Sequence, residues 1–453
     1  MPTQVEQLET ALMAAIGRAL DSGSLKGAAP ESIKLERPKD RTHGDYASSI
    51  ALQLAKPAGM NPREVAQIIA DQLIGVDGIS KVDIAGPGFI NITLNRASQA
   101  TLVETILKST KDFGKGNALA GVKINLEFIS ANPTGPLHLG HTRWAAVGDA
   151  LGRVLTAAGA QVTREFYIND RGNQMDYFGQ SVEAVALGNP VPENGYQGEY
   201  IKDLAADVVA QNAGIKDLPA DDRFVAFREA AYQLQLMDQQ RVLDTFNTHF
   251  DVWFSERSLH DQGAVEHGME KLRAQGHVFE VDGAVWLRTT DFGDDKDRVM
   301  TKSDGSLTYF SSDTAYYINK RERGFDICIY MLGADHHGYI GRLKATAACA
   351  GDNPEYNIHV LIGQLVKIME GGEEVKLSKR AGTIITLEEL VEKVGVDAAR
   401  YTLIRYPVDT PMVMDLDVLK RNTNENPVYY VQYAHARIAA VLRNAQELGA
   451  ALE

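Results

Sequence analysis

The chain has 453 residues, of which 44% are hydrophobic and 23% are charged, which is the composition of a globular protein. A chain of this length is too long for one compact core, so we expect about three or more domains. Its net charge of −14 argues mildly against a nucleic-acid partner, although a basic stripe can sit on an acidic body. No secretory signal, no apolar run long enough to span a bilayer and no CxxC motif is visible, so we predict a cytoplasmic protein with no membrane segment and no protein-built metal site.

Residues 1–110 have the pattern of a small α/β domain, because apolar residues recur first at helical and then at strand spacing. The expected helix from Tyr46 would have Asp45 at its cap, and Asn61-Pro62 would open the next helix. The predicted helices of this domain cover residues 3–20, 46–55, 62–73 and 96–108. The predicted strands cover residues 33–35, 81–85 and 89–94.

The last of these strands has an unusual alternation, with Phe89 and Asn91 on one face and Ile90 and Ile92 on the other. An exposed aromatic ring beside an amide can stack on an unstacked base and hydrogen-bond to it. A surface strand that binds nothing explains the spacing equally well, so both interpretations stay open from the residues alone.

Residues 115–172 predict a strand over 122–127, a turn, a helix from Thr142 to Gly159, and a strand over 161–168. This is a βαβ unit, which implies a parallel sheet.

His138 and His141 are spaced by Leu139-Gly140 where the helix of this unit starts. The N-terminus of a helix attracts phosphate, histidine can donate to phosphate oxygens, and Gly140 would let a purine lie against the backbone. Two histidines in a surface loop are the alternative.

Residues 173–306 do not continue this alternation of strand and helix, and we interpret them as insertions between two halves of the sheet. The predicted elements there are helices over 224–246 and 260–275 and a hairpin that turns at Asp282-Gly283. The alternation of strands and helices returns over 307–370. The predicted strands there are 307–310, 327–332 and 359–363, and the predicted helices are 314–323 and one that ends before Ala350. Gly333 and Asp335 follow the most apolar of these strands, where a carboxylate commonly holds ribose hydroxyls.

Residues 371–422 contain a basic loop, Lys376-Leu377-Ser378-Lys379-Arg380, and then a helical connector. Solvated surface is the alternative for such a charge run. Residues 423–453 predict one long helix, 426–448, with an apolar stripe, which we interpret as the start of a larger helical domain that this chain does not complete. The predicted fold is therefore α/β: a Rossmann-type parallel sheet with insertions, a small N-terminal α/β domain and a helical C-terminal region.

Three loops, 132–141, 333–338 and 376–380, would meet at one edge of this sheet and together suit attack on the α-phosphate of ATP. At this point the chain resembles the class I aminoacyl-tRNA synthetases. His138-Leu139-Gly140-His141 is similar to their HIGH motif, and Lys376–Arg380 is similar to their KMSKS loop, with Leu for Met and Arg for the last Ser.

Within that class the chain resembles the arginyl-tRNA synthetase family over nearly its whole length. The segments that carry this resemblance are 43–45, 88–91, 127–133, 395–401 and 430–434. It implies activation of L-arginine with ATP to arginyl-adenylate, transfer to the 3′ end of tRNA(Arg), and release of AMP and pyrophosphate. It also implies Mg²⁺ carried with ATP, a monomeric enzyme, and a need for bound tRNA even to activate arginine.

The resemblance further implies a role for individual residues. Glu127, Tyr309 and Asp313 would surround the guanidinium of arginine, and Ser130 and Asn132 would hold its α-amino and carboxylate groups. The implied catalytic residues are His138, His141, Lys376 and Lys379; the implied ATP-binding residues are Gly140, Gly333, Asp335 and Ser378; the implied tRNA-binding residues are Phe89 and Asn91. The D-loop of tRNA would meet residues 1–110, and 423–453 would begin an anticodon-binding domain.

Two other hypotheses remain at this stage. A non-catalytic, tRNA-binding relative would keep the fold without the reaction, but both histidines and both loop lysines are present. A smaller nucleotidylyltransferase with an H-x-G-H loop would not need tRNA, but it leaves the long insertion and the helical C-terminus unexplained. Arginine-dependent exchange of pyrophosphate into ATP, with and without tRNA, distinguishes the three.

Overall fold

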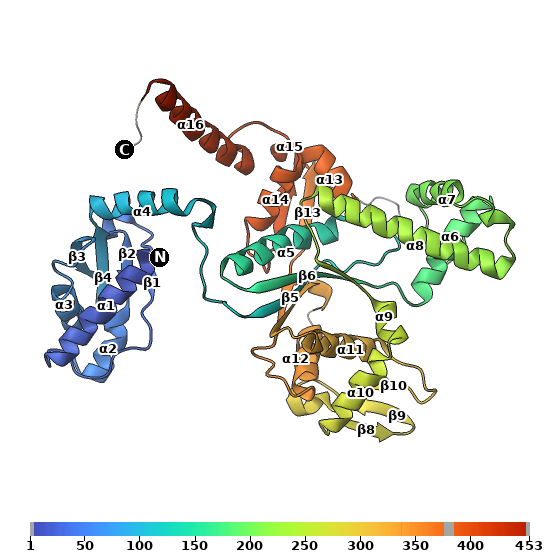
Figure 1. The fold of residues 1–453 in the computed structure, drawn as a ribbon, viewed down its shortest axis with the longest axis horizontal. Helices are drawn as coiled ribbons and strands as arrows, with labels where there is room; N and C mark the ends of the chain where they lie inside the picture. Colours follow the sequence, from blue (N-terminus) through green and yellow to red (C-terminus); the bar gives the residue numbers. More distant parts are fainter. Residues whose placement is uncertain (1–3, 337, 376–384, 450–453) are drawn as a thin grey trace. The chain divides into compact units, whose positions relative to one another are not determined.

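A computed structural model describes residues 4–336, 338–375 and 385–449 (Figure 1). The chain divides into two compact units, Met1–Lys115 and Gly116–Glu453, each with its own core. Among the described residues, no helix combines the length and the apolarity that a membrane crossing requires.

The first unit is a four-stranded antiparallel sheet packed against helices, in the strand order β1-β2-β4-β3. Ile90 and Ile92 of β4 are fully buried in its core, together with Leu12 and Ile16 of α1. Its strands are β1 (Leu35–Glu36), β2 (Tyr46–Ser48), β3 (Ile79–Ala85) and β4 (Phe89–Leu94); its helices are α1 (Gln4–Asp21), α2 (Ile50–Ala58), α3 (Pro62–Asp71) and α4 (Arg96–Ser109).

The prediction of a helix from Tyr46 capped by Asp45 was wrong. Residues 46–48 form β2, which pairs with Ile90–Ile92 of β4, and the helix begins only at Ile50. The Asp45 carboxylate accepts a hydrogen bond from the Leu94 backbone N–H across the sheet, so it is not available as a cap. The predicted cap at Asn61 is confirmed, because its side chain accepts from the Arg63 N–H.

The second unit is built on a five-stranded parallel sheet in the order β12-β11-β5-β6-β7. The chain runs outward from β5 through β6 to β7, and then returns to the other side of β5 with β11 and β12. Such a reversal opens a crevice at the C-terminal ends of β5 and β11, where ligands bind in these sheets. The strands are β5 (Lys123–Glu127), β6 (Gln161–Ile168), β7 (Val252–Ser255), β11 (Ile327–Gly333) and β12 (Ile358–Gly363). The predicted fold class is confirmed.

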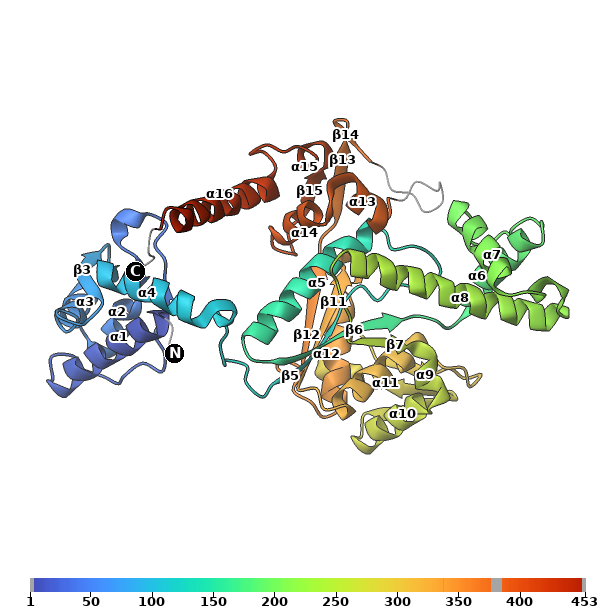
Figure 2. The ribbon, with the colours of Figure 1, turned by 45° about the horizontal axis from the view of Figure 1, so that its top comes forward.

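Helices cover both faces of this sheet (Figures 1 and 2). α5 (Leu139–Ala157) lies on one face, and α11 (Tyr309–Glu322) and α12 (Tyr339–Cys349) lie on the other. Successive side chains of a strand point to opposite faces, so Leu126 of β5 joins the core on the α5 side while Glu127 faces α11. Tyr330 of β11, opposite Glu127 in register, belongs to the core on the α11 side.

The predicted strand over 307–310 was also wrong, because α11 already begins at Tyr309. The Thr308 N–H and hydroxyl donate to Met300 O and Val299 O, and these bonds hold the start of the helix against β10. The strand β7 was not predicted at all: it lies within 173–306, yet it forms the edge of the main sheet.

The region between β6 and α11 is mainly helical. α8 is the longest helix of the chain as described, and the helix predicted over 260–275 is divided into α9 and α10. The predicted hairpin is confirmed: Asp282 and Gly283 have φ of 52° and 76° between β8 and β9, and β10 pairs with β9. The helices are α6 (Asn173–Ala186), α7 (Glu199–Gln211), α8 (Ala220–Thr245), α9 (Glu256–Asp261) and α10 (Ala264–Ala274); the strands are β8 (Val278–Val281), β9 (Ala284–Leu287) and β10 (Arg298–Thr301).

After β12 the chain forms a small unpredicted sheet, β14-β13-β15, with α13 and α14 between β14 and β15 and with α15 and α16 after β15. The long helix predicted at the C-terminal end is confirmed, and none of its residues is buried. These elements are β13 (Val366–Glu370), β14 (Glu373–Glu374), β15 (Met412–Asp415), α13 (Leu387–Val394), α14 (Val396–Ile404), α15 (Leu416–Leu419) and α16 (Pro427–Glu447). Short 3-10 turns occur at Arg41–His43, Thr110–Asp112, Ile215–Asp217, Thr289–Phe292 and Ala334–His336.

Candidate active site

The two predicted histidines together cap the N-terminus of α5. Gly140 N–H donates to Nδ1 of His138 over 3.1 Å, and His138 N–H donates to Nδ1 of His141 over 3.3 Å. The ring centroids lie 4.0 Å apart. Because Nδ1 accepts in both rings, each neutral imidazole carries its proton on Nε2. The structure therefore places two N–H donors at the positive end of a 19-residue helix.

Gly140 is required by this cap. A Cβ added at Gly140 would lie 2.8 Å from Cε1 of the His138 ring, closer than carbon atoms can approach. The space that the sequence suggested for a purine is thus occupied, on this side of the backbone, by the His138 imidazole.

The segment that follows the basic loop is hydrogen-bonded to the histidine motif. Leu139 N–H donates to Ile385 O over 3.2 Å, and Leu387 N–H donates to Leu137 O over 2.8 Å. His138 and Thr386 form an antiparallel bridge. Lys376, Ser378 and Lys379 lie outside the described residues, but residue 385 on their C-terminal side is fixed next to α5.

α5 is also held along its length by two arginines, Arg143, which is buried, and Arg400, which is partly buried. Arg143, 3% exposed, donates to the carbonyl oxygens of Gln364, Pro407 and Thr410. One turn and a half further on, Asp149 is 3% exposed along its side chain and accepts from Arg400 of α14.

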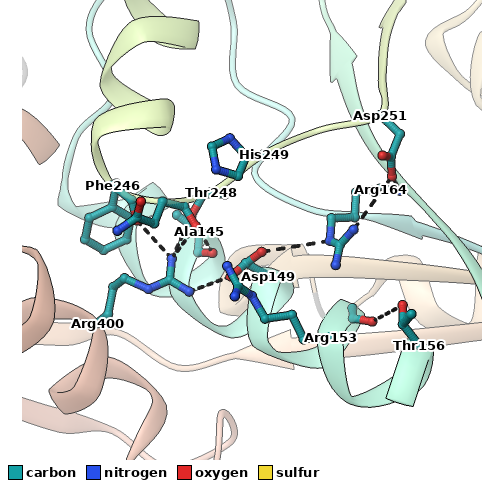
Figure 3. A network of polar contacts seen from close by, with 12 residues as sticks. Ala145, Asp149, Arg153, Thr156, Arg164, Phe246, Thr248, His249, Asp251 and Arg400 are labelled. Atoms are coloured by element: carbon teal, nitrogen blue, oxygen red, sulfur yellow. Dashed lines mark hydrogen bonds and ion pairs between the residues drawn. The ribbon is translucent and has the colours of Figure 1, made fainter. Parts of the chain in front are cut away.

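Figure 3 shows Arg400 reaching from α14 towards both Asp149 and the chain that follows α8. Its guanidinium donates to Asp149 over 2.5 Å and to Phe246 O, Asn247 O and the Thr248 hydroxyl over 3.0–3.1 Å. Arg153 contacts the same carboxylate from the solvent side. Arg400 therefore joins the histidine-bearing helix, the end of α8 and the C-terminal helices.

The turn after β5 is strained. Ile129 and Ser130 have φ of 69° and 47°, in the left-handed region that costs a non-glycine residue, and β-branched isoleucine above all, about 1–3 kcal/mol. This backbone brings the Ser130 hydroxyl back over the sheet, where it donates to Glu127 over 3.0 Å and accepts from Tyr167 N–H. The strain thus aims Ser130 at the end of the central strand.

The loop that contains Asn132 is supported by the insertion. The Asn132 amide donates to Gln174 of α6, and Gln239 of α8 donates to Asn132 O and Gly135 O. Asn132 itself is exposed at the mouth of the crevice.

Acidic side chains gather on the α11 side of β5. Burial, followed by the charges of Glu256 and Glu127, raises the pKa of Asp313 to about 7, against a lowering contribution from Arg342. Burial also raises the pKa of Glu256 to about 7, with Asp170 adding to the rise and Arg171 opposing it. Burial disfavours the charged forms of these carboxylates, and an incoming cation would offset that cost, so the acidic cluster favours a cation.

Glu127, predicted to read the guanidinium, already has a protein partner. The ammonium of Lys320 in α11 lies 2.5 Å from its Oε2, and Lys320 is fully buried. Tyr309 lies one turn before Asp313 on α11 and is 77% exposed, with its hydroxyl near Gly172, the N-cap residue of α6. The predicted trio is thus brought to one edge of the sheet, but with an internal cation among its members.

Of the predicted nucleotide-binding residues, Gly333 ends β11 and pairs with Gly363 across the crevice edge, and the side chain of Asp335 lies outside what the structure describes. In the first unit Phe89 is 39% exposed, whereas Asn91 is only 5% exposed between Ala47 and Asp83. Of the ring and amide that were expected to be exposed side by side, only the Phe89 ring is exposed.

Sequence reasoning missed Glu256 and Lys320, and it placed Asp170 at the end of a strand, where ligands bind, without giving it a role. Asp170 is 1% exposed and accepts from Ser255 Oγ over 2.6 Å, from Tyr232 Oη over 3.1 Å and from the Arg257 N–H, and so fixes the start of α9 that carries Glu256. The spacing of Asp313 and Lys320, two helical turns apart, was the only available signal for Lys320.

Comparisons with known proteins agree with this geometry. A family model for the arginyl tRNA synthetase N-terminal domain matches residues 6–94, and a model for the catalytic domain of class I tRNA synthetases (R) matches residues 102–435. A parallel sheet that reverses at β5, with an H-x-G-H cap on the helix that follows, together with this match, defines a class I aminoacyl-tRNA synthetase.

The similar curated proteins are arginine–tRNA ligases. Those of Paenarthrobacter aurescens and Frankia alni are each 54% identical, over 447 and 442 residues, which is 98% of this chain and 81% and 80% of the relatives. A solved putative arginyl-tRNA synthetase from Campylobacter jejuni is 35% identical with a TM-score of 0.72 over 78% of each chain. The Thermus thermophilus arginyl-tRNA synthetase, 19% identical with a TM-score of 0.74 over 98% of this chain and 82% of that one, shares the fold. The chain belongs to the arginyl-tRNA synthetase family.

Proposed function

We propose that this chain ligates L-arginine to tRNA(Arg) in two steps that consume ATP. The arginine carboxylate attacks the α-phosphorus of ATP, the bond to the bridging oxygen breaks, and pyrophosphate leaves. A hydroxyl at the 3′ end of the tRNA then attacks the carbonyl of arginyl-adenylate, and AMP leaves. The observation that carries this proposal is the cluster of buried carboxylates, Asp313, Glu256 and Glu127, on the α11 side of β5. The helix that follows β5, on the other face of the sheet, begins with the two histidines.

In this proposal the pocket reads the guanidinium of arginine. A planar cation with five donors is best matched by carboxylates at fixed positions, and Asp313 and Glu256 lie on two different helices, α11 and α9. Glu127, which is 7% exposed, contributes from the buried side of the cluster, and Tyr309, which is 77% exposed, contributes from its solvent side. Ser130 and Asn132, on the strained turn, hold the α-amino and carboxylate groups.

The enzyme then contributes placement and positive charge rather than a nucleophile. His138 and His141 steady the α-phosphate in the transition state with their Nε2–H groups, and Gly140 gives their cap its room. Lys376 and Lys379 stabilise the β- and γ-phosphates, while Gly333, Asp335 and Ser378 hold the rest of ATP. The pairing of residues 385–387 with 137–139 supports this convergence of the basic loop on α5. Mg²⁺ accompanies the triphosphate.

For the tRNA, we assign residues 1–110 to contact with its elbow, through Phe89 and the strand that carries Asn91, and α16 to the start of the anticodon-binding region. The enzyme works as a monomer in the cytoplasm. Ultracentrifugation with and without tRNA(Arg) checks the monomer, and a dimer would contradict it.

The test is exchange of labelled pyrophosphate into ATP by this chain, with each amino acid and with or without tRNA(Arg). Exchange that requires both arginine and the tRNA, followed by arginine-specific charging, supports the proposal. Exchange without tRNA would favour a smaller nucleotidylyltransferase activity. Binding of tRNA without exchange or charging would favour a non-catalytic relative.

A further inference from the structure

One face of α11 carries charged and aromatic side chains that have no role in the proposed reaction. Tyr309, Asp313, Tyr316, Lys320 and Arg323 recur at intervals of four and three residues, so they form one stripe that runs from the pocket mouth to the sheet interior. The first two residues belong to the proposed arginine pocket. The last three belong to an ionic group beneath it.

That group is fully connected. Lys320 Nζ lies 4.2 Å and 3.8 Å from the ring centroids of Tyr316 and Tyr330, in addition to its ion pair with Glu127. Tyr316 donates to Glu165 over 2.5 Å, and Arg323 donates to the same carboxylate through two nitrogens. The ammonium is therefore enclosed by one carboxylate and two aromatic faces, and it has no route to solvent.

Both oxygens of Glu127 are consequently occupied before any substrate arrives. Oε2 accepts from Lys320 over 2.5 Å, and Oε1 accepts from Ser130 Oγ over 3.0 Å. Glu127 itself is 7% exposed, so little of its carboxylate is accessible from outside.

We propose that Lys320 is a specificity-determining residue, which acts through Glu127 to exclude alkylamine substrates such as L-lysine and L-ornithine from the arginine pocket; the inference rests on the proposed function. The built-in ammonium occupies the point at which the ammonium of such a substrate would pair with Glu127.

The physical basis is a repulsive element that the two substrate classes feel differently. A point-like ammonium from a substrate needs a carboxylate at close range, and at Glu127 it meets the like charge of Lys320. A guanidinium spreads its charge over a plane and donates sideways, so it can use Asp313 of α11 and Glu256 of α9. Lys320 thus acts as a positioning residue, because it holds Glu127 and does not itself touch the substrate.

The experiment compares arginine with lysine and ornithine in pyrophosphate exchange with tRNA(Arg), for the wild-type chain and the variants Lys320→Met and Lys320→Gln. Each variant frees the Glu127 carboxylate, so we expect the preference in kcat/KM for arginine over each amine to fall by about tenfold or more. The double variant Lys320→Met/Glu127→Gln removes that carboxylate as well, and its rate with the amines should return towards the wild-type level. An unchanged preference in a folded single variant overturns the proposal.

Lys271→Met is the matched control, because Lys271 pairs with Glu322 of the same helix α11 at the surface, outside the pocket. Its preference should equal that of the wild type. Should neither Lys320 variant fold, competition on the wild-type chain decides: guanidinium and agmatine should inhibit arginine-dependent exchange, whereas n-butylamine should not, and equal inhibition overturns the proposal. Absence of arginine-dependent exchange in the wild type would instead refute the proposed function.

Discussion

Arg400 should be the side chain outside the pocket on which the stability of the second unit depends most. Replacing it with Met removes the main partner of a carboxylate that is 3% exposed, and leaves Phe246 O, Asn247 O and Thr248 without their donor. Loss of one member of a buried ion pair costs about 3–5 kcal/mol. Arg153 still contacts Asp149, so we expect the lower end for the pair and about 1 kcal/mol for the three other acceptors. The total is about 4 kcal/mol.

Tryptophan fluorescence in urea measures this loss directly, because all three tryptophans, Trp144, Trp253 and Trp286, lie in the second unit. Arg153→Met is the matched control: it contacts the same Asp149 but is 61% exposed, so its loss should cost less than about 1 kcal/mol. Equal midpoints for the two variants would refute the assignment of Arg400, through the buried carboxylate of Asp149, as the link between α5, α8 and α14.

Three further outcomes follow from the site. Burial is the main cause that raises the pKa values of Asp313 and Glu256 to about 7. Between about pH 4 and 7 the folded state therefore binds more protons at these two groups than the unfolded state does. Their contribution lowers the stability of the substrate-free protein as pH rises through that window. Arginine needs their ionised forms, so its KM should fall as pH rises from 6 to 8 while the KM for ATP stays level; parallel changes would argue against the acidic pocket. His138→Asn keeps a good helix cap but removes the Nε2 donor. The thermal unfolding temperature should stay unchanged while the rate of pyrophosphate exchange falls on the order of a hundredfold. A fall in both the unfolding temperature and the exchange rate would show that the ring serves only the cap. Lys379→Ala should lower exchange on the order of a hundredfold with the fold intact by circular dichroism, and wild-type activity would remove the basic loop from the mechanism.

Local patterns predicted the elements whose limits are set by neighbouring residues. The strand 161–168, the Asp282-Gly283 hairpin and the Asn61 cap were found where they were expected, because alternation and turn chemistry act over a few residues. Residues 46–48 and 307–310 failed for the opposite reason. Pairing with β4 draws the first into a strand, and hydrogen bonds to β10 start a helix in the second.

The candidate site divides in the same way. The histidine cap could be predicted, since His138 and His141 are three residues apart at a helix start. The pairing of Glu127 with Lys320 joins residues 193 positions apart, and Glu256 reaches the pocket only because the unpredicted β7 leads into α9. No single-sequence spacing records such contacts, which depend on how the sheet is assembled.

The central claim is that the buried carboxylates on the α11 side of β5 read the guanidinium of arginine, and Asp313→Asn tests it most directly. Asparagine keeps the shape but loses the charge, so arginine binding measured by titration calorimetry and the KM for arginine in exchange should both weaken by about tenfold or more. The affinity for ATP should stay within about twofold of the wild type, because the triphosphate is held elsewhere. An equal loss for arginine and ATP, or no loss for arginine, would contradict the account.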